Sequence, residues 1–203
     1  MSFLKGLAFG FLLAATVGPM WILCFRRTLA HGRLFGFVSG MGVATADALY
    51  GSMAAFGLTA VSGFLLAQKF WLAAIGGAFL CWLGVKTLLS HPGDRPADVP
   101  AGSLAVAYTS TFALTLTNPA TILAFVAIFA GLGLAASTSY AEAALVVLGV
   151  VIGSAFWWTV LAVGAGWLRK RAGPRLLRAI NIVAGVSILA FGIHTLGTLL
   201  VAL

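Results

Sequence analysis

The chain has 203 residues, of which 62% are hydrophobic and only 8% are charged, and its mean hydropathy is +1.10. A soluble domain carries about 25% charged residues, so twelve basic and four acidic residues are too few to cover a water-facing surface. This composition excludes most soluble enzymes and predicts a polytopic membrane protein. The net charge of +8 does not indicate a nucleic-acid partner, because the basic residues lie in short connections between apolar stretches.

Six apolar stretches follow one another along the chain, and a spanning helix needs about 20 such residues. We expect helices at 4–25, 34–60, 70–89, 104–132, 143–168 and 179–201. The alternating segments of about ten residues that mark a membrane β-barrel are missing. The predicted fold class is therefore an all-α integral membrane protein with six transmembrane helices.

The basic residues are distributed unevenly between the two sides of this predicted bundle. Lys5 and Lys69 belong to one side, whereas ten others fall in the first, third and fifth connections. Those ten are Arg26, Arg27, Arg33, Lys86, Arg95, Arg169, Lys170, Arg171, Arg175 and Arg178. Because cytoplasmic connections are rich in Lys and Arg, we expect both chain termini to face outward.

Three internal matches indicate that the chain is a repeat. Segments 18–25 and 118–125 share Pro, Ile, Leu and Phe at a spacing of 100 positions, and the GxxxG pattern at 36–40 recurs at 149–153. At a spacing of 108, the third and sixth spans pair Gly77 with Gly185, Gly84 with Gly192, Thr87 with Thr195 and Leu88 with Leu196. Three spans is an odd number, so the copies must be inverted, as in many secondary transporters. We predict a first three-helix repeat at 1–90, a cytoplasmic linker at 91–103 and a second repeat at 104–203.

The first and fourth spans are predicted to be interrupted at Gly18-Pro19 and Asn118-Pro119. Proline removes a backbone donor, and backbone groups freed at membrane depth must be buried in protein or face a wet cavity. A helix that restarts after proline presents N–H groups suited to an anion such as a carboxylate. Neutral hydrogen-bond partners lie nearby at Thr16, Thr117 and the Asn118 amide. The alternative is that both prolines are plain structural kinks.

Asp47 is the only acidic residue within a predicted span. It lies 14 residues beyond Arg33, which is about 21 Å along a helix. A charge at this depth normally faces the interior of the bundle. We interpret Asp47 as a proton carrier or as the counter-charge of a substrate ammonium. The alternative is a structural carboxyl that is neutral or hydrogen-bonded to Tyr50 or Thr45.

The remaining candidates have weaker patterns. Trp157 and its neighbour Trp158 lie well inside the fifth span, where they could form an aromatic wall over a substrate or simply pack. The GxxxG pairs, which begin at Gly6, Gly36 and Gly149, favour close helix packing and leave a homodimer open. The sequence has neither a catalytic set nor a metal-ligand pattern, so we expect no enzyme activity, no cofactor and no metal.

These motifs, taken in order, resemble the LysE/RhtB amino-acid exporter family over essentially the whole chain. The resemblance rests on Gly18-Pro19, Gly32-Arg33-x-x-Gly36, Gly40-x-Gly42, Asp47-x-x-Tyr50, Thr117-Asn118-Pro119, and Gly166-Trp167-Leu168-Arg169-Lys170 with Asn181 and Gly185. It implies a proton-driven exporter of amino acids or close analogues in the bacterial inner (plasma) membrane, and a dimer. Family members often carry Lys after the Asn-Pro pair, where this chain has Ala120. This departure leaves the substrate open, a more apolar one included.

The sequence therefore predicts a secondary active exporter that works by alternating access, with protons and membrane lipid as its other partners. A zwitterionic amino acid would bind near mid-membrane between two inverted halves that rock against each other. Its carboxylate would meet the helices restarting after Pro19 and Pro119, while Asp47, Tyr50 and Trp157 would serve substrate binding or coupling. An ion or small-solute channel that uses the broken helices as a pore is the alternative. A non-transporting membrane scaffold is a third reading.

Overall fold

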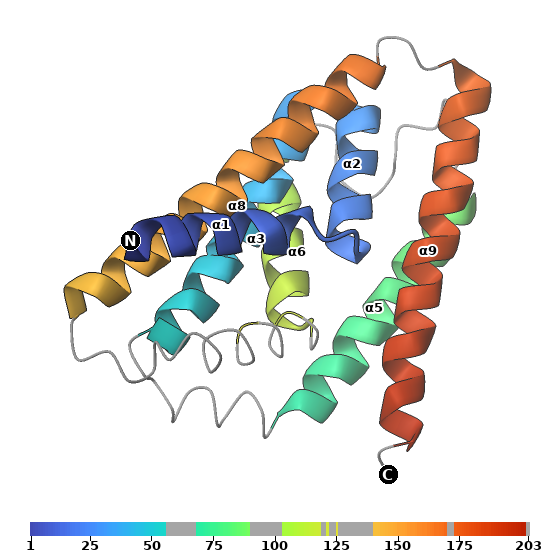
Figure 1. Ribbon diagram of the computed structural model, residues 1–203. Coiled ribbons are helices and arrows are strands. Elements are labelled where there is room, and N and C mark those ends of the chain that lie inside the picture. Colours follow the sequence, from blue (N-terminus) through green and yellow to red (C-terminus); the bar gives the residue numbers. More distant parts are fainter. Residues whose placement is uncertain are drawn as a thin grey trace.

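The computed structural model describes residues 1–55, 68–89, 103–118, 121, 125, 140–169 and 173–201, and every element in this part is helical. Figure 1 shows these helices as a bundle that widens from the end where α9 begins towards the end where α8 begins. The helices are α1 (Ser2–Ala15), α2 (Pro19–His31), α3 (Arg33–Ala55), α5 (Lys69–Leu89), α6 (Leu104–Leu116), α8 (Tyr140–Arg169) and α9 (Pro174–Val201).

The helices agree with the predicted membrane fold. Within the described residues, α8 and the Arg175–Leu199 part of α9 are long and apolar enough to cross a membrane, and the bent pair α1–α2 would make a third span. Ala73–Leu89 and Leu104–Leu116 are shorter apolar helices. The expected spans 34–60 and 104–132, and the linker, run into segments outside the described residues. The all-α fold is thus confirmed for the described residues and agrees with a membrane protein, while the count of six spans stays a prediction.

Two helix boundaries were predicted wrongly, and both involve basic residues. We expected the first span to end at residue 25, but α2 continues to His31 and places Arg26 and Arg27 inside the helix, where both are buried. The sixth span was expected from 179, but α9 begins at Pro174. Proline suits the first position of a helix because its missing N–H would have no partner there. The basic residues at these two boundaries were assigned to connections because they are charged, but they lie within helices.

The GxxxG glycines let α1 and α8 pack backbone to backbone. A Cβ atom on Gly6 or Gly10 would collide with the Val146 or Val150 carbonyl oxygen of α8. In return, a Cβ on Gly149 would collide with the Phe3 carbonyl and lie 2.7 Å from the Leu7 nitrogen. Small residues permit this close approach between membrane helices. Because these glycines are used within one chain, they give no support to a homodimer.

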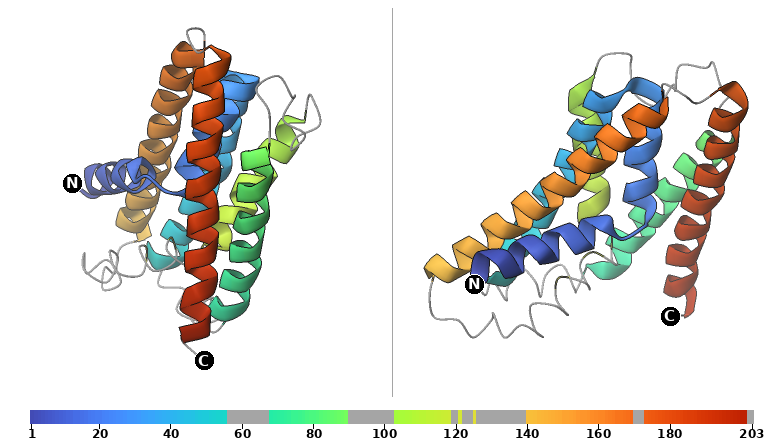
Figure 2. Two further views of the ribbon diagram at one scale, coloured as in Figure 1. Left: turned by 90° about the vertical axis from the view of Figure 1, so that its right-hand side faces the viewer. Right: turned by 45° about the horizontal axis from the view of Figure 1, so that its top comes forward.

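The helices form two groups with α2 between them (Figures 1 and 2). In the first group α1 and α3 pack on α8, and α6 packs on α3; in the second, α5 and α9 pack on each other. Each of the seven described helices contributes to one buried apolar cluster. Its members are Ala14, Met20, Leu23, Cys24, Val43, Ala44, Leu80, Leu83, Leu114, Trp158, Leu161 and Ile188. Ala14 and Met20 flank the first predicted break, so the two helices that meet there both reach the buried cluster, whereas Thr16 and Val17 between them are exposed.

The packing of α1 on α8 predicts a contrast between two glycines of the same helix. Gly149→Ala should lower the free energy of unfolding by about 1–3 kcal/mol, because the added methyl group overpacks the backbone of α1. Gly164→Ala should be neutral or slightly stabilising, since nothing lies within 4 Å of its Cβ position. Thermal unfolding in detergent measures both. Equal stability of the two variants would contradict the close α1–α8 contact.

Candidate functional site

The first predicted break is present between α1 and α2. The first helix ends at Ala15, the second begins at Pro19, and the two axes differ in direction by 73°. Gly18 is extended (φ −151°, ψ −174°), and its carbonyl accepts the first hydrogen bond of α2 from the Ile22 N–H at 3.0 Å. The N–H groups of the first turn of a helix have no partner within the helix. The break therefore presents the backbone donors of the first turn of α2 beside the buried residues Pro19 and Met20.

Only the α6 side of the second predicted break lies within the described residues. The α6 helix ends at Leu116, and Asn118 turns back to donate its N–H to the Thr115 carbonyl at 3.2 Å. Tyr50 donates its hydroxyl hydrogen to the Leu116 carbonyl oxygen at 2.6 Å. Leu116 is the last residue of α6, and the last carbonyl groups of a helix commonly find partners outside it, so Tyr50 satisfies a carbonyl at the helix end. Pro119 lies outside the described residues.

Both breaks contribute to the wall of one cavity. Its volume is about 10 Å³, which is room for roughly one water molecule. The lining residues come from the first turn of α2, from α5 and α9, and from the end of α6. They are Met20, Gly76, Gly77, Leu80, Leu114, Thr117, Asn118 and Thr195. The cavity thus joins the restarted first span to the Thr117-Asn118 turn, with apolar walls and a few neutral polar groups.

Asp47 is buried on α3, with 2% of its surface exposed, and it faces α8. The Ser154 hydroxyl donates a hydrogen bond of 2.8 Å to Oδ2 of Asp47. The Trp158 indole N–H in turn donates to the Ser154 Oγ at 3.2 Å. A carboxylate taken out of water needs such donors to remain charged. Asp47, Ser154 and Trp158 therefore form a buried polar chain across the α3–α8 contact.

In the structural alternative for Asp47, the expected hydrogen bond to Tyr50 or Thr45 is wrong, because Asp47 binds Ser154. Both residues face α6 instead: Tyr50 binds the Leu116 carbonyl, and the Thr45 hydroxyl accepts a hydrogen bond from the Tyr108 hydroxyl at 2.8 Å. The reason is the register of α3, which turns Asp47 towards Ser154. Helical spacing alone gave no information about which neighbouring helix each side chain meets.

The structure brings some of the candidate residues together and separates others. Thr117 and Asn118 line the cavity, and Pro19 is buried next to Met20. Asp47 is not among the lining residues, and Thr16 is exposed and donates to the Leu12 carbonyl of its own helix at 3.1 Å. Residues beside both breaks therefore line one cavity, whereas Asp47 lies at the contact between α3 and α8.

Trp157 packs at the side of α8 and does not line the cavity. Its ring meets Phe11 of α1 edge-on, with centroids 5.3 Å apart, and it packs against the buried apolar cluster. The indole nitrogens of Trp157 and Trp21 are buried and have no hydrogen-bond partner among the described residues. Buried donors without acceptors are uncommon in proteins. A role of Trp157 in substrate binding stays a prediction.

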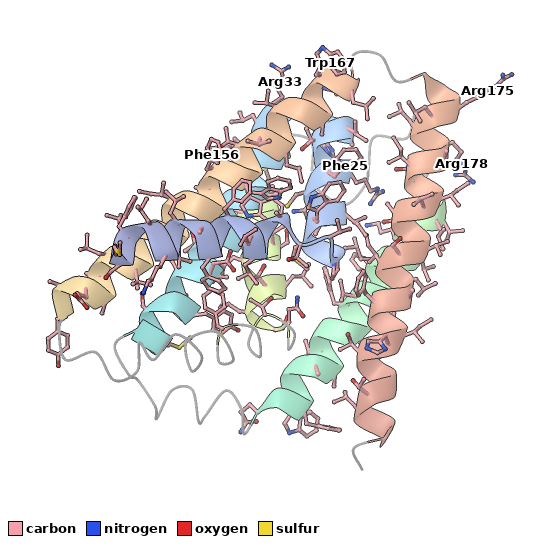
Figure 3. The ribbon with its side chains drawn as sticks, viewed as in Figure 1. Phe25, Arg33, Phe156, Trp167, Arg175 and Arg178 are labelled. Atoms are coloured by element: carbon pink, nitrogen blue, oxygen red, sulfur yellow. The ribbon has the colours of Figure 1, made fainter. Side chains whose placement is uncertain are left out.

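Two buried arginines were missed as candidate functional residues because they were interpreted only as orientation signals. Arg26 and Arg27 are 6% and 7% exposed. By contrast, Figure 3 shows Arg33, Arg175 and Arg178 towards the end of the bundle where α3 and α9 begin. A signal was present, since the helical pattern of the first span continues through Arg26 and Arg27 as far as Gly32. Gly32 has a φ of 100°, which suits glycine at a helix end.

The Asp47–Ser154 bond predicts energetic coupling between two helices. In a double-mutant cycle of Asp47→Asn and Ser154→Ala, we expect a coupling free energy of about 1–3 kcal/mol, because the bond joins a buried carboxyl to its donor. Thermal unfolding of the four proteins measures this energy. A second cycle with Thr45→Val, which removes a hydroxyl on the other face of α3, should be additive within about 0.5 kcal/mol. Additivity in the Ser154 cycle would contradict the observed contact.

Comparisons with known proteins agree with the membrane fold. A family model described as LysE type translocator matches residues 11–198. A Bacillus subtilis (strain 168) protein, named "Putative amino acid efflux protein YcgF", is 31% identical over 95% of this chain and 93% of its own length. The Escherichia coli (strain K12) "Uncharacterized membrane protein YahN" is 28% identical over 87% of this chain and 81% of its own length. No solved structure matches the chain.

The family match covers nearly the whole chain and includes the first break, Asp47, the cavity and both buried arginines. It describes a translocator, not an enzyme, and the apolar helices agree with a multi-pass membrane protein. The chain therefore belongs to the LysE type translocator family, as the sequence resemblance predicted.

Proposed function

We propose that this protein is a secondary active exporter of amino acids or close analogues in the bacterial inner membrane, with alternating access and proton coupling. The observation that carries the proposal is the cavity shared by the two helix breaks. The family and the name of the Bacillus subtilis relative support the transport of amino acids.

The substrate binds through backbone and neutral groups. N–H groups in the first turn of α2 and the Asn118 amide suit a carboxylate, because a helix N-terminus carries partial positive charge. Leu80 and Leu114 in the cavity wall suit an uncharged side chain once the cavity opens, because its observed volume holds roughly one water molecule. Segments 56–67 and 119–139 contain no charged residue. Asp47 is the only acidic residue in the middle of a predicted span, so the substrate is a zwitterion without a positively charged side chain.

Asp47 carries the coupled proton in this proposal. Its burial and its hydrogen bond to Ser154 on α8 make its charge state part of the α3–α8 contact. Because Asp47 does not line the cavity, this geometry favours a proton carrier over a direct partner of the substrate ammonium. Gain or loss of a proton would change the strength of the contact between the two helices.

The inverted repeat is supported by the contacts between α5 and α9. A Cβ on Gly77 would lie 3.0 Å from Leu196, and the equivalent Gly185 faces Leu88, which is the equivalent of Leu196. In the same way Gly84 faces Leu189, while Gly192 faces Cys81. All these residues are related by a spacing of 108 positions, so the contacts exchange under the repeat. With the basic end of the bundle in the cytoplasm, both termini face outward.

The decisive test is counterflow in proteoliposomes with a panel of labelled amino acids at two external pH values. We expect saturable exchange of at least one neutral amino acid, with net efflux that depends on the proton gradient. Flux that does not saturate and ignores the gradient would favour a channel. No flux of any amino acid would contradict the proposed function.

Asp47→Asn should abolish proton-driven efflux, because the amide cannot exchange a proton, while the protein remains folded. The matched control is Glu142→Gln, which makes the same change at an exposed acid in the first turn of α8 and should export at the wild-type rate. Initial efflux rates and thermal unfolding measure both variants. Wild-type export by Asp47→Asn would remove Asp47 from the mechanism.

A further inference from the structure

The packing of the helices does not follow the two halves of the sequence. The third span, α5, packs on α9 from the second half, and α3 packs on α8, also from the second half. Rocking one sequence half against the other would break both contacts. The described helices instead form a larger body of α1, α3, α6 and α8 and a smaller body of α5 and α9, as Figures 1 and 2 show.

The α2 helix connects these two bodies and carries a hydrogen-bonded arginine towards each of them. Arg26 donates to the Thr87 hydroxyl of α5 at 2.7 Å and to the Asn181 side-chain oxygen of α9 at 3.4 Å. It therefore binds the smaller body on both of its helices. Thr87 also donates its own hydroxyl hydrogen to the Leu83 carbonyl at 2.7 Å, which orients its oxygen towards the guanidinium.

Arg27, the next residue, binds the larger body. Its guanidinium donates to the Ser39 hydroxyl of α3 at 3.2 Å, and to the Ala107 carbonyl and the Ser110 hydroxyl of α6, both at 2.9 Å. Neighbouring positions on a helix point about 100° apart. Successive arginines therefore reach different partners, and together they hold both bodies to one helix.

This double contact lies on one side of the cavity along each of the four helices that line the cavity. On α2, Arg26 lies six residues beyond Met20, or about 9 Å further along the axis. On α5, Thr87 lies seven residues beyond Leu80, or about 10 Å. The contacts on α6 precede Leu114, and Asn181 precedes Thr195 on α9. The arginine contacts thus lie between the cavity and the basic end of the bundle.

We infer that Arg26 and Arg27 form the cytoplasmic gate of the transporter, and that the α5–α9 pair moves against the other body to open it. This inference rests on the proposed function. In this structure the gate is closed, because both arginines are buried and hydrogen-bonded to the two bodies at a level between the basic end and the cavity. The opening breaks the hydrogen bonds of at least one arginine while α5 and α9 stay together.

The first test measures access to the cavity from the cytoplasmic side. A reporter cysteine replaces Thr117 in a background of Cys24→Ala and Cys81→Ala, and inside-out vesicles are labelled with a membrane-impermeant thiol reagent. Thr87→Val with Ser110→Ala removes one acceptor from each arginine and should raise the labelling rate about tenfold, since bonds to charged groups hold the gate closed. The matched control is Thr28→Val, which removes a buried hydroxyl of α2 whose partner among the described residues is the Cys24 carbonyl of its own helix.

Unchanged labelling of the variant with both gate substitutions, or equal acceleration by Thr28→Val, would overturn the gate. Faster labelling only from right-side-out vesicles would overturn its cytoplasmic location. These outcomes are independent of the proposed function, because labelling requires no substrate. If the wild type shows no counterflow, the transport proposal fails whatever the labelling shows.

The second test asks which helices move together, and it does not depend on the gate variants. Gly192→Cys would place a Cβ 2.7 Å from both the sulfur and the backbone nitrogen of the native Cys81. The two helices must therefore move slightly apart before oxidation links α5 to α9, and counterflow by the reduced variant shows that the pair still folds. Mass spectrometry verifies the link, and the reduced protein is the control for folding. We expect equal counterflow in the oxidised and reduced states. Loss of transport on oxidation, restored by reductant, would overturn α5–α9 as one moving unit and favour rocking halves.

Discussion

A membrane offers no water to an unpaired backbone group, and this constraint governs the centre of the protein. Pro19 interrupts the first span, and α6 ends just before Asn118. These helix ends contact protein: Tyr50 binds the terminal carbonyl of α6, and Met20 in the first turn of α2 belongs to the apolar cluster. The small cavity lies where these two interruptions meet, so the feature that weakens each helix also creates the candidate site.

Close helix packing holds the rest of the architecture together. Glycines bring α1 against α8 and α5 against α9, so each contact depends on backbone approach more than on large side chains. The α2 helix fills the space between the two pairs and carries two buried arginines. A charge in the membrane interior is costly and usually functional. The buried charged groups have hydrogen-bond partners at separate contacts. Asp47 binds Ser154 between α3 and α8, and the two arginines bind Thr87 and Ser110 on opposite sides of α2.

Composition and the positions of the prolines predict much of this fold. Apolar length predicted the helices, and Gly18-Pro19 predicted the first break, because proline geometry is local. The partner of Asp47 was not predictable, since a single residue of helix rotation decides between Thr45, Tyr50 and Ser154. The arginines were assigned to a connection because charge was counted without asking whether neighbouring helices supply acceptors. Tertiary hydrogen bonding with Thr87 and Ser110 is the missing information.

The central claim is that the two helix breaks form one substrate site. An experimental structure of the protein with its transported amino acid bound would test this claim most directly. The account predicts a ligand whose carboxylate contacts the first turn of α2 and the Asn118 amide, with its side chain against Leu80 and Leu114. A bound amino acid that contacts neither break, or that lies on the outer surface of the helices, would contradict it.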